Sequence, residues 1–110
     1  MPDQNVNLSF DPNANPQFEF DRDTVTMTAA GKVIFHRRPS TAEWTFRDGA
    51  VKDDKLKEFS STVQGNGKLL DIDDKFYDRQ KTSYEYNITV ELHGTTYTSP
   101  DPHIVNDPGP

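Results

Sequence analysis

The stretch that decides the fold is Tyr84–Leu92, which reads YEYNITVEL. Apolar and polar residues alternate along it without a break, and the apolar ones are Tyr84, Tyr86, Ile88, Val90 and Leu92. Successive side chains of a strand point to opposite faces, so one face of this segment is apolar and the other is polar. The pattern predicts a half-buried strand of an antiparallel sheet.

Shorter extended segments lie on both sides of this strand. They are Val6–Phe10, Phe18–Phe20, Thr24–Thr28, Lys32–His36, Trp44–Arg47, Phe59–Val63, Leu69–Asp73 and Thr95–Ser99. The charged segment 52–58 is expected to form a loop or a single helical turn. About seven short strands without a convincing helix favour an all-β, antiparallel two-sheet sandwich, with an open barrel as the rival. We expect one domain over residues 1–100 and a proline-rich tail over 101–110.

Three dipeptides are expected to end or reverse strands. Asn66-Gly67 and His93-Gly94 predict two-residue hairpin turns, because these residues tolerate the positive φ angles that such turns require. The second turn would pair Leu92 with Thr95, which also keeps Tyr97 on the core face. Asp48-Gly49 is a turn signal that would end the strand of Trp44.

The composition excludes several kinds of partner. The chain has 110 residues, no cysteine and a net charge of -6 from 12 basic and 18 acidic side chains. An acidic chain repels phosphate groups, so neither nucleic acid nor a membrane surface is expected as a partner. Without cysteine there is no disulfide and no thiolate metal site. The amino end shows no basic region followed by an apolar one, so we expect a cytoplasmic protein.

The order of the residues resembles an immunoglobulin-type domain that lacks its disulfide. Trp44 stands on a middle strand, a Leu-x-Ile strand follows at Leu70 and Ile72, and an acidic crossover leads to Tyr84. In that family a tyrosine two residues before a cysteine bonds back to the preceding corner. The resemblance implies that Tyr84 is the corner tyrosine and that Tyr86 stands in place of the cysteine.

The end of the chain carries a second resemblance. The segment Asp101–Pro110 follows a Tyr-x-Ser strand end and resembles the small bacterial DP-EP family. That group is uncharacterised and mostly β-stranded. The resemblance implies a β fold and transfers no catalytic residue to this chain.

An acidic group is the strongest candidate for a metal site. Carboxylate oxygens at this spacing could bind calcium, and the candidates are Asp71, Asp73, Asp74 and Asp78. Strand alternation places Asp71 and Asp73 on the solvent face, and the segment lacks the glycine and terminal glutamate of an EF-hand loop. We therefore expect a solvated strand face and no bound metal or cofactor. Three histidines also lack ligand spacing, namely His36, His93 and His103.

No motif orders the serines, histidines and aspartates into a catalytic site, so we do not expect an enzyme. Most aromatic residues are needed in the core, and Tyr77 alone is expected to be exposed. Extended proline segments lose little entropy on docking, which makes the tail a candidate binding segment. The candidate partner-binding residues are Tyr77, His103, Ile104 and Val105. We expect a sandwich that binds a protein or itself through an edge strand or the tail, with a carbohydrate- or calcium-binding module as the alternative.

Overall fold

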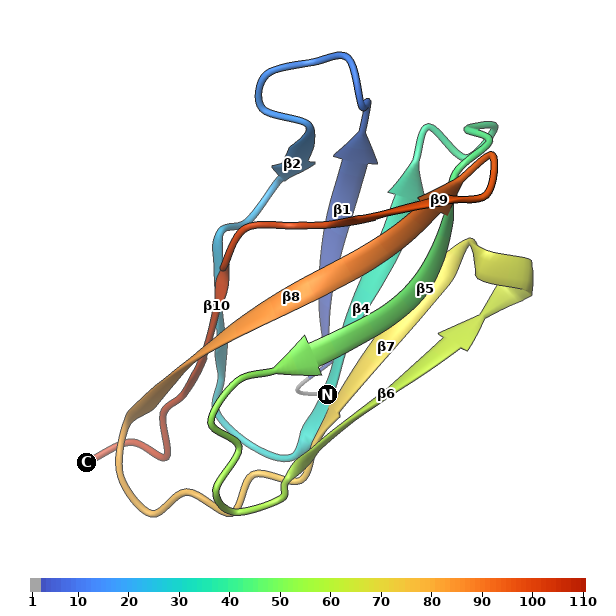
Figure 1. The fold of residues 1–110 in the computed structure, drawn as a ribbon. Coiled ribbons are helices and arrows are strands. Elements are labelled where there is room, and N and C mark those ends of the chain that lie inside the picture. The colour runs from blue at the N-terminus through green and yellow to red at the C-terminus, as the bar shows by residue number, and fades with distance from the viewer. Residues whose placement is uncertain (1–2) are drawn as a thin grey trace.

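The computed structural model describes residues 3–110, which form two packed β-sheets (Figure 1). The strands of these residues are β1 (Gln4–Phe10), β2 (Phe18–Phe20), β3 (Thr24–Met27), β4 (Gly31–Arg38), β5 (Thr45–Val51), β6 (Phe59–Gln64), β7 (Leu69–Asp74), β8 (Thr82–Leu92), β9 (Thr95–Thr98) and β10 (His103–Asn106). The predicted all-β two-sheet sandwich is confirmed, with more strands than expected. In the described part of the chain, no helix is long and apolar enough to cross a membrane.

Each of the two sheets has its own strand order. One has the order β2-β1-β4-β7-β6, and the other has the order β3-β10-β8-β5 with β9 added beside β8. Strand β1 runs parallel to β4, and β3 runs parallel to β10, so both sheets are mixed rather than purely antiparallel. An immunoglobulin domain is built from antiparallel sheets, whereas both sheets here contain a parallel pair of strands. The immunoglobulin-like order therefore stays a prediction.

Strand β8 is the centre of its sheet, as the alternation predicts. It pairs with β5 on one side and with both β9 and β10 on the other. Tyr86, Ile88 and Val90 have no exposed surface, and Tyr84 is also buried. The side chains of Tyr86, Ile88 and Val90 form one core with Phe35, Leu70 and Ile72 of the opposite sheet.

The tail is part of the sandwich. Residues 103–106 form β10, which lies between β3 and β8 in the sheet (Figure 1). Ile104 is fully buried, and its neighbours His103 and Val105 are half-buried on the other side of the strand. The expected boundary at residue 101 is therefore corrected, because residues 103–106 pair on both sides within the sheet and Ile104 belongs to the core.

Strand β5 runs through Asp48-Gly49, where the sequence predicts a turn. The ladder with β8 shifts by one residue between Phe46 and Asp48, which makes Arg47 part of a β-bulge. A Cβ on Gly49 would lie 3.0 Å from Leu70 Cδ2 of the opposite sheet. The glycine therefore permits close packing of the two sheets instead of a chain reversal.

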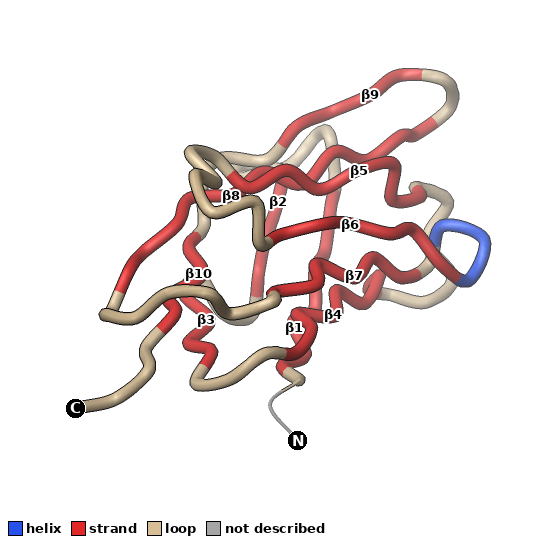
Figure 2. Tube along the Cα trace, turned by 90° about the horizontal axis from the view of Figure 1, so that it is seen from below, coloured by secondary structure: helices blue, strands red, loops and turns tan. Residues whose placement is uncertain are grey.

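The two predicted hairpin turns differ in outcome. His93 and Gly94 form the expected turn, with φ angles of 51° and 81°, and Leu92 pairs with Thr95 as predicted. The connection between β6 and β7 is longer than predicted, because Gln64 pairs with Leu69 and residues 65–68 form the loop. A 3-10 turn, η1 (Gly65–Gly67), occupies most of this loop and is the blue segment in Figure 2.

Tyr86 carries a buried hydroxyl group at the centre of the core. Its ring is fully buried, and within residues 3–110 its hydroxyl has no hydrogen-bond partner. An unsatisfied buried hydroxyl costs about 1–3 kcal/mol, so Tyr86→Phe should leave the free energy of unfolding unchanged or raise it. Urea unfolding measures the difference. The matched control is Tyr84→Phe on the same strand, which removes a bonded hydroxyl and should lose stability. Equal losses of stability in the two variants would contradict the conclusion that the Tyr86 hydroxyl is unbonded and the Tyr84 hydroxyl is bonded.

Candidate functional site

The structure separates the four aspartates that the sequence singles out. Asp71 lies on the outer face of its sheet, where Lys32 Nζ is 3.7 Å from Asp71 Oδ2 and the Gln64 amide donates to the same oxygen. Asp71 is only 8% exposed, so the prediction of a solvated side chain is wrong there. Asp73 shares that face and is half-buried. Asp74 lies on the inner face, because side chains alternate along β7.

Asp74, at the end of β7, shares a hydrogen-bond donor with two further carboxylates. Glu58 directly precedes β6, and Asp78 lies in the crossover between β7 and β8. Strand β8 contributes Tyr84, and β10 contributes Asn106. We call these five residues the carboxylate cluster. Glu58, Asp74 and Asn106 have no exposed surface.

Tyr84 and Asn106 connect the three carboxylates. Tyr84 Oη lies 2.9 Å from Glu58 Oε2 and 2.7 Å from Asp78 Oδ1. Asn106 Nδ2 lies 3.1 Å from Glu58 Oε1, 3.1 Å from Asp74 Oδ1 and 2.8 Å from Asp78 Oδ2. Segments far apart in the sequence thus converge on one hydroxyl and one amide.

Backbone amides of the crossover also donate to the cluster. Tyr77 N–H donates to Glu58 Oε1, and Phe76 N–H donates to Asp74 Oδ1, each over 2.9 Å. On the opposite side, the Asp54 carboxylate accepts hydrogen bonds from the N–H groups of Glu58 and Phe59. The cluster therefore ties the loop before β6 to the crossover after β7.

The environment divides the three acids into two kinds. Burial raises the pKa of Glu58, and burial also raises the pKa of Asp74 to about 6. Burial acts on Asp78 in the same direction, but hydrogen bonds from Tyr84 and Asn106 outweigh it and hold the pKa of Asp78 below its usual value. Burial and the adjacent carboxylates raise the pKa of the Tyr84 hydroxyl, so it remains a donor. The environment thus stabilises the ionised form of Asp78 and shifts Glu58 and Asp74 towards the neutral form.

The point that the carboxylates surround is occupied by Asn106 Nδ2. Over the described residues, no group of three or more histidine, aspartate or glutamate side chains is arranged to hold a metal ion. The three histidines lie apart: His36 contacts Asn5, His93 faces Glu43 and His103 faces Glu85. In place of a metal centre, the cluster forms a hydrogen-bonded network of acids.

A surface hollow of about 430 Å³ opens beside the cluster. Asp78 and Tyr84 line it, together with the charged residues Lys52, Asp53, Lys55 and Glu85. Lys52 Nζ is engaged by Asp101 Oδ1 at 2.8 Å. The cluster is therefore closed on the side of Glu58 and Asp74 and borders solvent at Asp78 and Tyr84.

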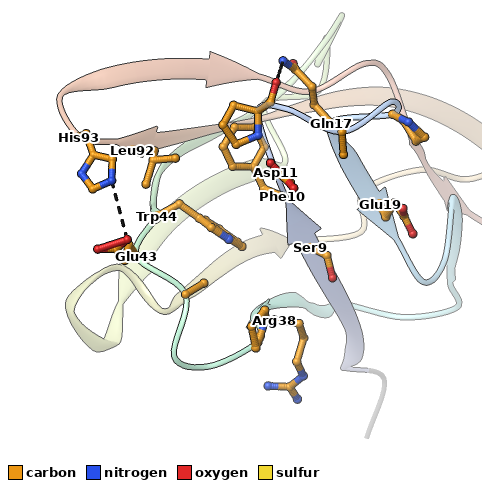
Figure 3. A pocket seen from close by; sticks show the side chains of 15 residues that line it. Ser9, Phe10, Asp11, Gln17, Glu19, Arg38, Glu43, Trp44, Leu92 and His93 are labelled. Carbon is orange, nitrogen blue, oxygen red and sulfur yellow. Dashed lines mark hydrogen bonds and ion pairs between the residues drawn. The ribbon is translucent and has the colours of Figure 1, made fainter.

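A second hollow of about 430 Å³ lies at the opposite end, among the connections that follow β1, β4 and β8 (Figure 3). Phe10, Trp44 and Leu92 line it, and at its rim His93 Nε2 is 3.8 Å from Glu43 Oε2. Trp44 is 2% exposed, so its ring offers no open face on which a sugar could stack.

The predicted partner-binding residues fall into two groups. Tyr77 is 55% exposed, next to the cluster that its own N–H helps to build. His103, Ile104 and Val105 belong to β10 inside the sheet, so they do not form a free docking segment. Tyr84 and Tyr86 are buried, so among the described residues they give Tyr77 no exposed aromatic partner for stacking a sugar, and the carbohydrate alternative stays a prediction.

The model of the DP-EP family matches residues 2–108 of the chain. The chain belongs to the DP-EP family. The matched range contains every strand and the whole carboxylate cluster, so the cluster lies within the DP-EP unit. A search of the curated proteins found no match.

Two residues of the cluster are absent from the sequence-based candidates. Glu58 lies in the segment KDDKLKE, where nothing distinguishes one buried acid from its solvated neighbours. Asn106 lies in the tail, but it is two residues from Ile104, and the period of a strand places both on the same face. That spacing is the signal that could have revealed Asn106 in this DP-EP chain.

Proposed function

We propose that this DP-EP chain is a protein-binding module that pairs the free edge of β6 with β6 of a second copy. The observation that carries the proposal is the edge itself, because within the described residues β6 pairs with β7 alone. The N–H and C=O groups of an unpaired edge are a template for another strand.

Strand β6 lacks the protection that the other edges have. Its sequence, FSSTVQ, contains no charge and no proline, although 27% of the chain is charged. Strand β2 has 3 residues, β3 and β9 have 4 each, and β5 carries a bulge beside Arg47 and Asp48. Short length, bulges and charges are the features that keep edges from pairing.

The ladder defines which amides face outward. Lys75 N–H donates to Glu58 O, and hydrogen-bonded pairs alternate along an antiparallel ladder. The residues of β6 that bond to β7 are therefore Ser60, Thr62 and Gln64. The others turn their amides to the open edge, and Asp54 already accepts from the first of them, Phe59. The N–H groups left for a partner are those of Ser61 and Val63.

A two-fold arrangement satisfies both of these amides. Antiparallel pairing centred on Thr62 sets Ser61 of one copy opposite Val63 of the other, in hydrogen-bonded pairs. Because β6 carries no charge, the paired residues themselves bring no like charges opposite each other, and the charge beside the pairing is Asp48 of β5, which accepts a hydrogen bond from the Ser61 hydroxyl. The 38% exposed side chain of Val63 would gain contacts across the new interface.

Light scattering over a concentration series tests the proposal. The 12.5 kDa chain should show twice its mass at high concentration. Val63→Lys places a charge at the edge, and Ser61→Pro removes an outward N–H without removing a bond to β7, so both should be monomers. Thr26→Lys, an exposed position on edge strand β3, is the matched control and should remain a dimer. A chain that is monomeric at every concentration, or a dimeric Val63→Lys variant, would refute the proposal.

A further inference from the structure

We infer that the carboxylate cluster is a proton-operated lock: a proton on its buried acids holds the 75–81 crossover and β10 against the start of β6, and losing that proton loosens this end of the sandwich. The inference does not depend on self-association through β6. It rests on the number of hydrogens available to the cluster, on its burial and on the charges around it.

The Tyr84 hydroxyl has fewer hydrogens than carboxylate contacts. It has one hydrogen, but it contacts Glu58 Oε2 at 2.9 Å and Asp78 Oδ1 at 2.7 Å. If both acids were ionised, one contact would join two acceptors without a hydrogen between them. A proton on Glu58 Oε2 resolves this, because Glu58 then donates to Tyr84 Oη and Tyr84 donates to Asp78.

The Asn106 side-chain amide also has fewer hydrogens than carboxylate contacts. Its two hydrogens face three carboxylate oxygens, which belong to Glu58, Asp74 and Asp78. Among the described residues, two further buried oxygens have no donor, namely Asp74 Oδ2 and Asn106 Oδ1. Acceptors therefore outnumber hydrogens at these contacts, and a proton on Asp74 Oδ2 would neutralise a buried oxygen that has no donor within the described residues.

The surrounding charges do not form ion pairs with the buried acids Glu58 and Asp74 or with the half-buried Asp78. The loop before β6 brings Asp54, Asp53, Lys52 and Lys55 near the cluster, and β8 brings Glu85. Lys52 is held by Asp101, and no ion pair within residues 3–110 joins a basic side chain to Glu58, Asp74 or Asp78. Separating like charges or protonating them is then the lowest-energy response.

The direction of the pH effect follows from linkage. The folded-state pKa of Asp74, at about 6, is above the ordinary pKa of 3.8 for this side chain, so its stabilising effect is present at low pH and is lost as the pH rises through 6. The raised pKa of Glu58 acts in the same direction. From Asp74 alone, the unfolding equilibrium constant should fall about tenfold between pH 7.5 and pH 5.

Chemical unfolding of the full chain at these two pH values tests the lock. The intact chain should be more stable at pH 5. Glu58→Gln supplies an amide hydrogen in place of the proton, and Asp74→Asn removes a buried charge. Each variant should be more stable than the intact chain at pH 7.5 and should lose part of the pH dependence. Asp73→Asn, on the outer face of the same strand, is the control and should keep it.

Hydrogen exchange locates the effect. After correction for intrinsic rates, the amides of Tyr77 and Tyr86, which bond to Glu58 and to Pro102 at the start of β10, should lose protection at pH 7.5 more than Val90 in the centre of β8. Uniform loss over the whole chain, or stability that rises towards pH 7.5, would overturn the inference. So would calcium stabilising the intact chain at pH 7.5 but not the Asp78→Asn variant, because a cation would then hold the cluster.

Discussion

Trp44→Ala should lower the free energy of unfolding by about 3–5 kcal/mol, the range for removing a large buried aromatic side chain. Trp44 precedes β5 and is 2% exposed. Its ring lies edge-on to Phe46 at 5.0 Å and to Phe10 at 6.2 Å, between centroids, so it joins the start of β5 to the end of β1 in the opposite sheet. The substitution leaves a cavity lined by aromatic rings that cannot close around alanine.

Urea unfolding followed by circular dichroism measures this loss. Trp44→Phe is the matched control, because it keeps an aromatic ring and removes an indole N–H that has no hydrogen-bond partner among the described residues. That variant should lose much less than the alanine variant. Melting of Trp44→Ala close to that of the intact chain would show that Trp44 does not hold the two sheets together.

The sequence predicts well where a local pattern determines the structure. The alternation of Tyr84–Leu92 placed the central strand, and the two-residue turn at His93 fixed its register with β9. The pattern failed where tertiary contacts decide. Asp48-Gly49 has the composition of a turn, but the glycine lies against Leu70 of the other sheet, and no local signal reveals that contact. The parallel pairing of β1 with β4 joins segments that no hairpin connects.

The carboxylate cluster shows the same division. Asp74 and Asp78 attracted attention as acids near each other in the sequence, and the resemblance to a corner tyrosine singled out Tyr84. Their common partner Asn106 comes from the far end of the chain and Glu58 from a loop. Polar residues in loops and tails are usually solvated, so burial of these two depends on how β10 enters the sheet. The chemistry of the cluster is therefore a property of the topology.

Gly67→Ala should lower the free energy of unfolding by about 2–4 kcal/mol, from backbone strain and steric overlap together. Gly67 has a φ of 86°, a conformation that L residues avoid. A Cβ at this position would lie 2.6 Å from Thr45 Cβ and 2.9 Å from Thr45 Cγ2. Thr45 begins β5, so relief of the overlap requires the β6–β7 loop or β5 to move.

Gly94→Ala separates the two causes. Gly94 has a similar φ of 81°, but a Cβ there meets no atom within 4 Å. This variant should lose only the strain of the left-handed backbone, about 1–2 kcal/mol, and the excess loss in Gly67→Ala measures the contact with Thr45. Thr45→Ala removes the methyl group at 2.9 Å and should restore part of the stability of Gly67→Ala, whereas it should not help Gly94→Ala. Equal losses in the two glycine variants would mean that the η1 loop is not held against β5, and the packing of this loop between the two sheets would have to be revised.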